Sequence, residues 1–195
     1  VIASEALTWR QVLLIAICVV LTGLDGFDVL SISFASPGIA KDWGIERGAL
    51  GIVLSAELLG MAVGSVVLGN VADKIGRRPT ALACLTVMAA GMFGAAHVNS
   101  IETLSLLRLF TGLGIGGMLA CTNAMVAEFA NDRWRAAAIG IMAAGYPMGA
   151  ILGGAFASSL LVDGTWRDVF TFGGYISAAM LPVVFFLVPE TVGYL

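Results

Sequence analysis

The sequence predicts an all-α membrane protein with six transmembrane helices, and three observations support that fold class. Apolar residues make up 59% of the 195 residues and charged residues only 12%, about half the share in an average soluble domain. The chain contains 25 glycines, and glycine is frequent in membrane helices. The apolar runs are long and continuous, whereas a membrane β-barrel would show short alternating segments.

Charged and turn residues divide the chain into six apolar runs, each near the ~20 residues that a helix needs to cross a bilayer. Each run should be helical, because backbone polar groups in lipid have to be satisfied within the segment. The layout permits two three-helix units, 10–97 and 102–188, in which the first and fourth helices are equivalent. The predicted spans form one domain, 1–195, and cover residues of about 10–35, 48–69, 79–97, 102–128, 136–161 and 168–188.

The basic residues give the orientation of these spans. One set of span ends carries six of them, Arg10, Lys74, Arg77, Arg78, Arg133 and Arg135. The opposite set carries three, Lys41, Arg47 and Arg167. The positive-inside rule places the larger set in the cytoplasm, so both termini are expected to be cytoplasmic. An interfacial aromatic belt supports the boundaries, because all four tryptophans lie at predicted span ends or in loops: Trp9, Trp43, Trp134 and Trp166.

Four ionisable residues lie inside the predicted spans: Asp25, Asp28, Glu57 and Arg108. A charge at mid-bilayer costs at least ~2.5–3.5 kcal/mol on insertion scales, and such residues usually face a bundle interior or a water-filled cavity. At about 1.5 Å per helical residue, all four fall in one layer in the outer half of the bilayer. At this similar depth, we expect the four residues to share a single polar cavity.

The residue types in this layer suit the handling of protons and anions. Asp25 and Asp28 share a helix face, and two nearby carboxylates resist double ionisation, so one is expected to carry a proton. Arg108 stays charged and can hold one aspartate ionised or bind a carboxylate substrate through its fork. Glu57 can pair with Arg108 or face the pore. The alternative for the whole set is a static structural ion pair.

Glycines recur every four residues in three of the spans. This spacing predicts close helix packing, and some of the stripes could also serve as moving interfaces. Pro147 is expected to kink the fifth span, and Gly26 to loosen the first. The stripes comprise Gly60 and Gly64, Gly112 and Gly116, and Gly145, Gly149 and Gly153.

The stretch "GNVADKIGRRPT", residues 69–80, resembles the signature loop of the major facilitator superfamily, with the pattern G-x-x-x-D-[RK]-x-G-R-[RK]. In that family the loop binds the other half of the transporter and favours one access state. A topology anchor alone would explain the two arginines, but not the glycines or the aspartate. The matching residues are Gly69, Asp73, Lys74, Gly76, Arg77 and Arg78.

Other stretches resemble the same superfamily. "RLFTGLGIGG" resembles its fourth-helix motif, whose arginine, here Arg108, is associated with proton coupling. "EFANDRWR" resembles the loop after the fourth helix, with Glu128 and Arg135 as the expected cytoplasmic charge pair. "GYPMGAILGG" resembles the fifth-helix motif, and "PET" the end of the sixth helix. "DGFD", residues 25–28, resembles the D-G-[FY]-D motif of the aromatic acid:proton symporters.

The resemblance implies the amino-terminal half of a twelve-helix transporter, built from two inverted three-helix repeats. We expect the carboxy-terminal half to be absent because the chain is part of a longer protein; a half-size transporter acting as a homodimer is the alternative. The implied location is a bacterial inner membrane, and the expected partners are the lipid bilayer and the missing half.

The implied activity is proton-coupled import of a small organic acid, such as 4-hydroxybenzoate or benzoate, with protons as coupling ion and no other cofactor. No enzyme activity is expected, because no nucleophile–base or metal constellation appears, and no nucleic acid partner is expected either. The alternatives are a related carrier of a sugar or nicotinate, and a non-transporting membrane sensor or scaffold with the same fold.

Overall fold

The computed structural model describes residues 8–189, apart from the side chain of Arg47. Six long helices account for nearly all of this range, and each is long and apolar enough to cross a membrane. The predicted number and class of elements are therefore confirmed. The helices are α1 (Trp9–Trp43), α2 (Leu50–Ile75), α3 (Arg77–His97), α4 (Ile101–Phe129), α5 (Arg135–Asp163) and α6 (Trp166–Leu187), with a short 3-10 helix η2 (Arg47–Ala49) before α2.

Two helices run further than the sequence predicts. The first span was expected to end at residue 35, but α1 continues through Pro37 to Trp43, and the next residue, Gly44, has a φ of 63° in the left-handed region. The second was expected to end at residue 69, but α2 continues to Gly76, whose φ is 103°. The other four spans agree within two residues at either end. These two helices end directly before a glycine with a positive φ, rather than where the apolar run stops.

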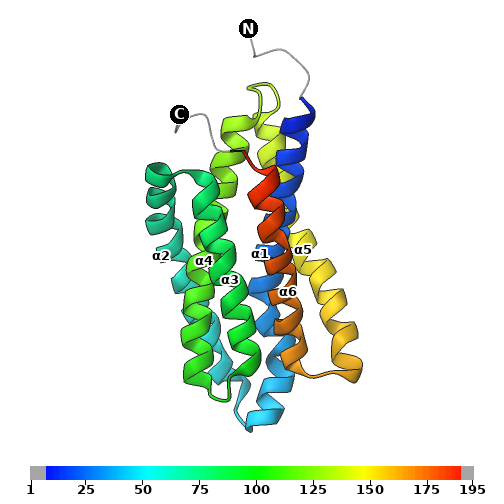
Figure 1. Cartoon of the computed structure of the whole chain (residues 1–195). Helices are drawn as coiled ribbons and strands as arrows, with labels where there is room; N and C mark the ends of the chain where they lie inside the picture. The colour runs from blue at the N-terminus through cyan, green and yellow to red at the C-terminus, as the bar shows by residue number, and fades with distance from the viewer. Residues whose placement is uncertain (1–7, 190–195) are drawn as a thin grey trace.

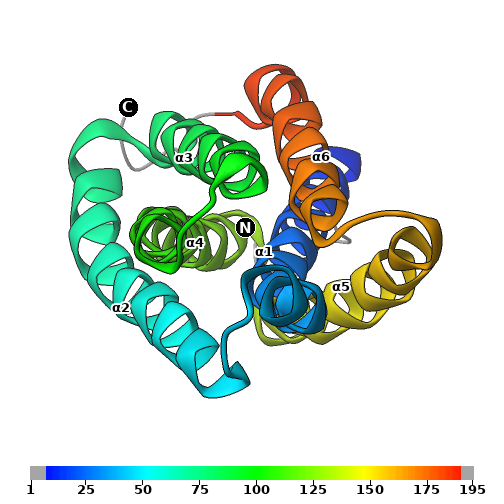
Figure 2. The ribbon, with the colours of Figure 1, turned by 90° about the horizontal axis from the view of Figure 1, so that it is seen from below.

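The helices run alternately up and down, so the start of α1 and the end of α6 lie at the same end of the bundle (Figure 1). Viewed along the bundle, α1 and α4 lie in the middle, α2 and α5 lie on opposite flanks, and α3 and α6 share one side (Figure 2). The most extensive packing joins α2 to α4, α1 to α5 and α3 to α6. This pattern is unchanged when the two three-helix units are exchanged, as the predicted equivalence of the first and fourth helices requires.

Glycines form the two closest helix contacts. A Cβ added at Gly60 of α2 would overlap the carbonyl oxygen of Leu109, and one at Gly112 of α4 would overlap that of Glu57. In the α1–α5 pair, a Cβ at Gly149 would overlap the carbonyl oxygen of Gly23. The glycine stripes are therefore confirmed as sites of close packing. Both Gly26 and Pro147 lie within continuous helices.

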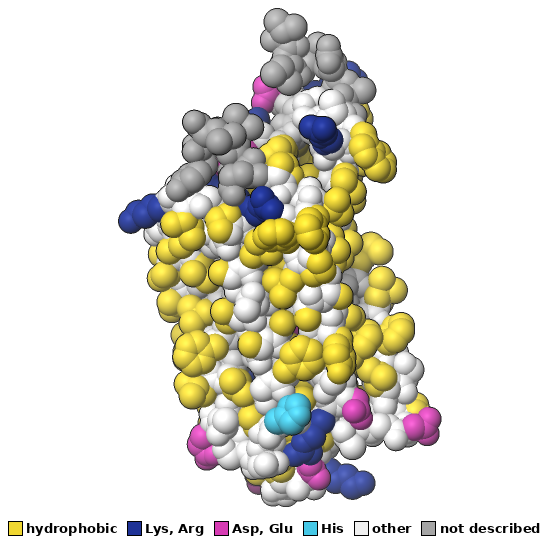
Figure 3. Space-filling model, viewed as in Figure 1, with side chains coloured by type: hydrophobic (Ala, Val, Ile, Leu, Met, Phe, Trp, Pro, Cys, Tyr) yellow, Lys and Arg dark blue, Asp and Glu magenta, His cyan; other side chains and the backbone are white. Residues whose placement is uncertain are grey.

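The surface of the bundle carries the pattern of a membrane protein. Apolar side chains cover the middle of the face shown in Figure 3, and charged side chains lie at its two ends. Large apolar side chains are also exposed along α2 and α5, the two flanking helices. All four tryptophans lie at helix ends or directly beside them, as predicted for an interfacial belt.

A polar network fixes the end of the bundle where α1 extends beyond its predicted span. Asp42 accepts hydrogen bonds from the indole Nε1 of Trp166 at 3.1 Å and from Nη1 of Arg167 at 3.0 Å. Nη2 of Arg167 donates to the side-chain oxygen of Asn99 at 3.0 Å. The additional turns of α1 thus bind the beginning of α6, and Arg167 joins the beginning of α6 to the connection between α3 and α4.

The glycine contacts lead to a stability prediction for the full-length protein in detergent. Gly60→Ala places a methyl group against the backbone of α4 and should lower the free energy of unfolding by about 1–3 kcal/mol. Gly51→Ala is the matched control on the same helix, because nothing lies within 4 Å of its added Cβ. The control should be neutral or slightly stabilising. Equal melting temperatures in a thermal-shift assay would show that α2 and α4 do not pack this closely.

Candidate functional site

Three polar residues of α1 follow one another at intervals of three, so they lie on one face of the helix. They are Thr22, Asp25 and Asp28, and all three are buried. Glu57 of α2 and Arg108 of α4 are also buried, with 1% and 0% of their surface exposed. All four of the predicted intramembrane charges therefore lie inside the bundle.

Arg108 is the centre of this cluster. Its Nη1 lies 3.0 Å from Oε1 of Glu57, forming a buried ion pair, and 3.2 Å from the main-chain carbonyl oxygen of Asp28. Its Nη2 contacts the sulfur of Met92 at 2.8 Å. The guanidinium carbon lies 4.8 Å from the centre of the Phe170 ring, in cation–π geometry. Residues from α1, α2, α3 and α6 thus surround a single cation on α4.

The carboxyl groups of the cluster are only partly satisfied. Neither oxygen of Asp25 or Asp28 has a hydrogen-bond partner within the described residues, and the same holds for Oε2 of Glu57 and Nε of Arg108. Asp28 lies within electrostatic reach of Arg108, Glu57 and Asp25. One cation and three carboxyls cannot all be ionised in an apolar interior. With Glu57 neutralising Arg108, the two aspartates are expected to be neutral acids in this arrangement.

The structure corrects one expectation about these residues. They were predicted to face a shared polar cavity, but all four are buried inside the bundle. Close glycine packing of α2 on α4 leaves little space on one side, and Met92 and Phe170 close the cluster on the other. The structure brings the four residues together, and of the two arrangements left open for Glu57 it shows the ion pair with Arg108.

Three residues of the site were not identified in the sequence analysis. Met92 and Phe170 resemble ordinary core residues, and only their contact with Arg108 reveals another role. Tyr146 precedes the helical Pro147 and is half-buried, within electrostatic reach of Asp25 and Glu57. A tyrosine beside a proline in an apolar run was the signal that could have identified it. Tyr146 connects the enclosed cluster with a more exposed part of α5.

The loop between α2 and α3 forms a second polar site at the end of the bundle. Gly76 makes the tight turn, with a φ of 103° that favours glycine. Arg77 contacts Asp73 through Nη1 at 2.6 Å and Glu128 through Nη2 at 3.1 Å, so it joins α2, α3 and α4. Arg78 donates to the carbonyl oxygen of Phe185 and lies 5.0 Å from the centre of its ring, which adds α6.

The remaining residues of this site differ in part from expectation. Glu128 and Arg135 were predicted to pair with each other, but Glu128 pairs with Arg77, while Arg135 pairs with Asp132 at 2.8 Å. Arg135 pairs with Asp132 because Asp132 is only three residues away and lies within reach of its side chain. Gly69 lies on α2, where a Cβ would meet Ala120 of α4 at an ordinary 3.5 Å.

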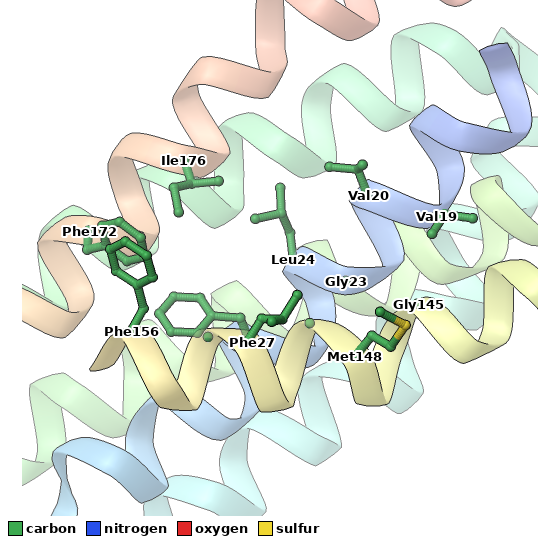
Figure 4. Close-up of a pocket in the computed structure, with 13 residues that line it drawn as sticks. Val19, Val20, Gly23, Leu24, Phe27, Gly145, Met148, Phe156, Phe172 and Ile176 are labelled. Atoms are coloured by element: carbon green, nitrogen blue, oxygen red, sulfur yellow. The ribbon is translucent and has the colours of Figure 1, made fainter. Parts of the chain in front are cut away.

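An apolar pocket of about 430 Å³ lies between α1, α5 and α6 (Figure 4). Its lining includes Val20, Leu24 and Phe27 of α1, which follow a different helix face from Asp25. The side chains of Phe156 and Phe172 stack at one end, with ring centres 5.1 Å apart. This lining offers an anion no hydrogen-bond donor, so the pocket is separate from the charge cluster.

Comparison with known proteins identifies the family. The profile of the Major Facilitator Superfamily matches residues 7–194, so the chain belongs to this superfamily. The chain is 33% identical over 185 residues to the gallate transporter of Pseudomonas putida. It is 32% identical over 187 residues to the 4-hydroxybenzoate transporter PcaK of Pseudomonas aeruginosa. These matches cover 95% and 96% of this chain but 41% of each relative, so the chain spans about two fifths of their length.

Solved structures show the same fold. The proton:xylose symporter XylE superposes with a TM-score of 0.84 at 16% identity, covering 93% of this chain and 45% of XylE. The described helices therefore form the amino-terminal half of a major facilitator fold. The chain is a multi-pass membrane protein of a transporter family rather than of an enzyme family. The cytoplasmic placement of both termini stays a prediction from the basic residues.

The ion pair and the unpartnered aspartates predict effects of very different size for two similar substitutions in the full-length protein. Glu57→Gln leaves Arg108 buried without a counterion and should lower the free energy of unfolding by about 3–5 kcal/mol. Asp28→Asn removes a carboxyl that has no partner and should change it by less than about 1 kcal/mol. Thermal unfolding in detergent measures both. An equally large loss for Asp28→Asn would mean that its carboxylate is ionised and paired with Arg108.

Proposed function

We propose that the full-length protein is a proton-coupled symporter that imports a small aromatic carboxylate, such as 4-hydroxybenzoate or benzoate. The observation that carries the proposal is the buried cluster of one arginine and three carboxyls, which combines an anion-binding group with groups able to hold protons. The similarity to transporters named for gallate and 4-hydroxybenzoate supports an aromatic acid as substrate. The likeness to XylE supports the fold alone, because only 16% of residues are identical.

Each residue of the cluster has a chemical role in this proposal. Arg108 binds the substrate carboxylate, because a guanidinium presents a planar fork of donors that fits a carboxylate. Asp25 and Asp28 take up protons from the outside, since neither has a cation of its own within hydrogen-bond reach in the described chain. Proton and anion are then released inward after the two halves of the transporter rock about the site.

The loop between α2 and α3 has the conformational role in this proposal. Gly69, Asp73, Gly76, Arg77 and Arg78 position a loop that binds the other half of the transporter and favours one access state. The ion pairs of Arg77 with Asp73 and Glu128 support this role, because they fix the loop to its own half. Arg135, at the start of α5, extends the charged surface that faces the cytoplasm in this proposal.

The remaining half of the transporter is the principal partner in this proposal. In this fold substrates bind near the middle of the membrane between the two halves, so an opening of the enclosed cluster toward the other half would give the substrate access. The protein acts in the inner membrane of a bacterium, with protons as coupling ion and no further cofactor.

The proposal is tested by uptake of radiolabelled 4-hydroxybenzoate into cells that express the full-length protein. Uptake should depend on the proton gradient and stop when a protonophore collapses it. Asp25→Asn and Asp28→Asn should each lower gradient-driven uptake by at least about tenfold, as expected for the loss of a proton-transfer group. Asp163→Asn, which neutralises an exposed carboxylate at the end of α5, is the matched control and should leave uptake unchanged. Undiminished, proton-dependent uptake in both aspartate variants would contradict the proposed role of Asp25 and Asp28 in proton coupling.

A further inference from the structure

The carboxylate of Glu57 lies where the proposed function places the carboxylate of the substrate. Nη1 of Arg108 is shared by Oε1 of Glu57 and the carbonyl oxygen of Asp28, and Nη2 is held by the sulfur of Met92. Both hydrogens of Nη1 are used by these two oxygen acceptors, so a substrate carboxylate can bind at Nη1 only if one of them leaves. Glu57 is the partner with the same chemistry and charge as the substrate. When Glu57 leaves, the substrate carboxylate can take its place, and Arg108 again binds one carboxylate.

We propose that Glu57 is an internal stand-in for the substrate: it neutralises Arg108 in the empty carrier, and a substrate carboxylate replaces it there. The inference rests on the proposed function and adds a residue that determines coupling. It also explains why an acid on α2 lies beside the only arginine of the cluster in the described chain.

The exchange determines the proton balance. Before exchange, Arg108 and Glu57 carry one positive and one negative charge. After exchange, Arg108 pairs with the substrate, and an ionised Glu57 would be a buried charge without a partner, which is strongly unfavourable. Glu57 therefore takes up one proton as it leaves Arg108. The net charge of the cluster, with the substrate included, is the same before and after the exchange. One proton is thereby bound for each monovalent anion, so the coupling is electroneutral.

The groups that face Glu57 supply a route for this proton. They are Arg108 on α4, Asp28 on α1 and Tyr146 on α5. Asp25 lies three residues before Asp28 on α1 and is within electrostatic reach of both Asp28 and Tyr146. A neutral Asp28 can pass its proton to Glu57 and be reloaded through Asp25. The aspartates then act as carriers along the route, whereas Glu57 links the proton to substrate binding.

The first experiment measures binding of 4-hydroxybenzoate to the purified full-length protein between about pH 6 and about pH 8. If binding takes up one proton, the affinity of the wild type should fall by about tenfold for each pH unit in the upper part of this range. In Glu57→Gln the affinity should be higher and nearly independent of pH, because a neutral amide neither competes for Arg108 nor takes up a proton. Glu102→Gln, at an exposed position at the start of α4, is the matched control and should keep the wild-type slope.

Transport by reconstituted protein gives a second readout. In proteoliposomes, Glu57→Gln should exchange labelled for unlabelled substrate but lose accumulation driven by a proton gradient. A wild-type pH slope and wild-type accumulation in Glu57→Gln would overturn the inference while leaving the proposed function intact. Absence of binding and uptake in the wild type would instead overturn the proposed function.

A third readout needs no substrate and covers the case in which Glu57→Gln does not fold. In the substrate-free protein, Arg108→Gln removes the counterion of Glu57, which should become a neutral acid. Infrared spectroscopy should then show an additional protonated carboxyl band, and the double variant Glu57→Gln, Arg108→Gln should lack it. If Arg108→Gln shows no such band, Arg108 does not hold Glu57 ionised and the inference fails, whatever the substrate is.

Discussion

The buried guanidinium of Arg108 is the constraint on which the rest of the structure depends. A permanent cation inside a membrane bundle has to be neutralised and hydrogen-bonded, because it cannot lose its charge. Glu57 supplies the charge, and a carbonyl oxygen, a thioether and an aromatic ring supply the remaining contacts. Five of the six helices meet at this one side chain, so its environment couples the positions of α1, α2, α3, α4 and α6.

Glycine contacts make this arrangement possible. Because Gly60 and Gly112 bring the backbones of α2 and α4 into contact, the short side chain of Glu57 reaches Arg108 on the neighbouring helix. The equivalent contact between Gly23 and Gly149 joins α1 to α5. The same packing solution thus appears once in each of the two symmetry-related helix pairs, although only one of the pairs contains the arginine.

The number of helices and the residues of the charge cluster could be predicted from the sequence, because both follow from the cost of placing polar groups in lipid. The ends of α1 and α2 could not, since they depend on Gly44 and Gly76 rather than on hydropathy. Enclosure of the cluster depends on Met92 and Phe170, whose apolar side chains give no sign of their contact with a cation. The predicted partner of Glu128 was wrong, because its actual partner, Arg77, lies 51 residues away in the sequence and comes close only in the folded bundle.

The interleaved packing of the two three-helix units has a consequence for the order in which the protein is made. The main partner of α2 is α4, that of α1 is α5, and that of α3 is α6. The first three helices therefore pack less extensively on one another than they later pack on the last three. Synthesis proceeds from the amino terminus, and Asp25, Asp28 and Glu57 therefore reach the membrane ahead of Arg108. The nascent chain has to place three acids in the bilayer before their cation arrives, and the arrival of α4 is the step at which α2 gains its main packing partner and Glu57 its counterion.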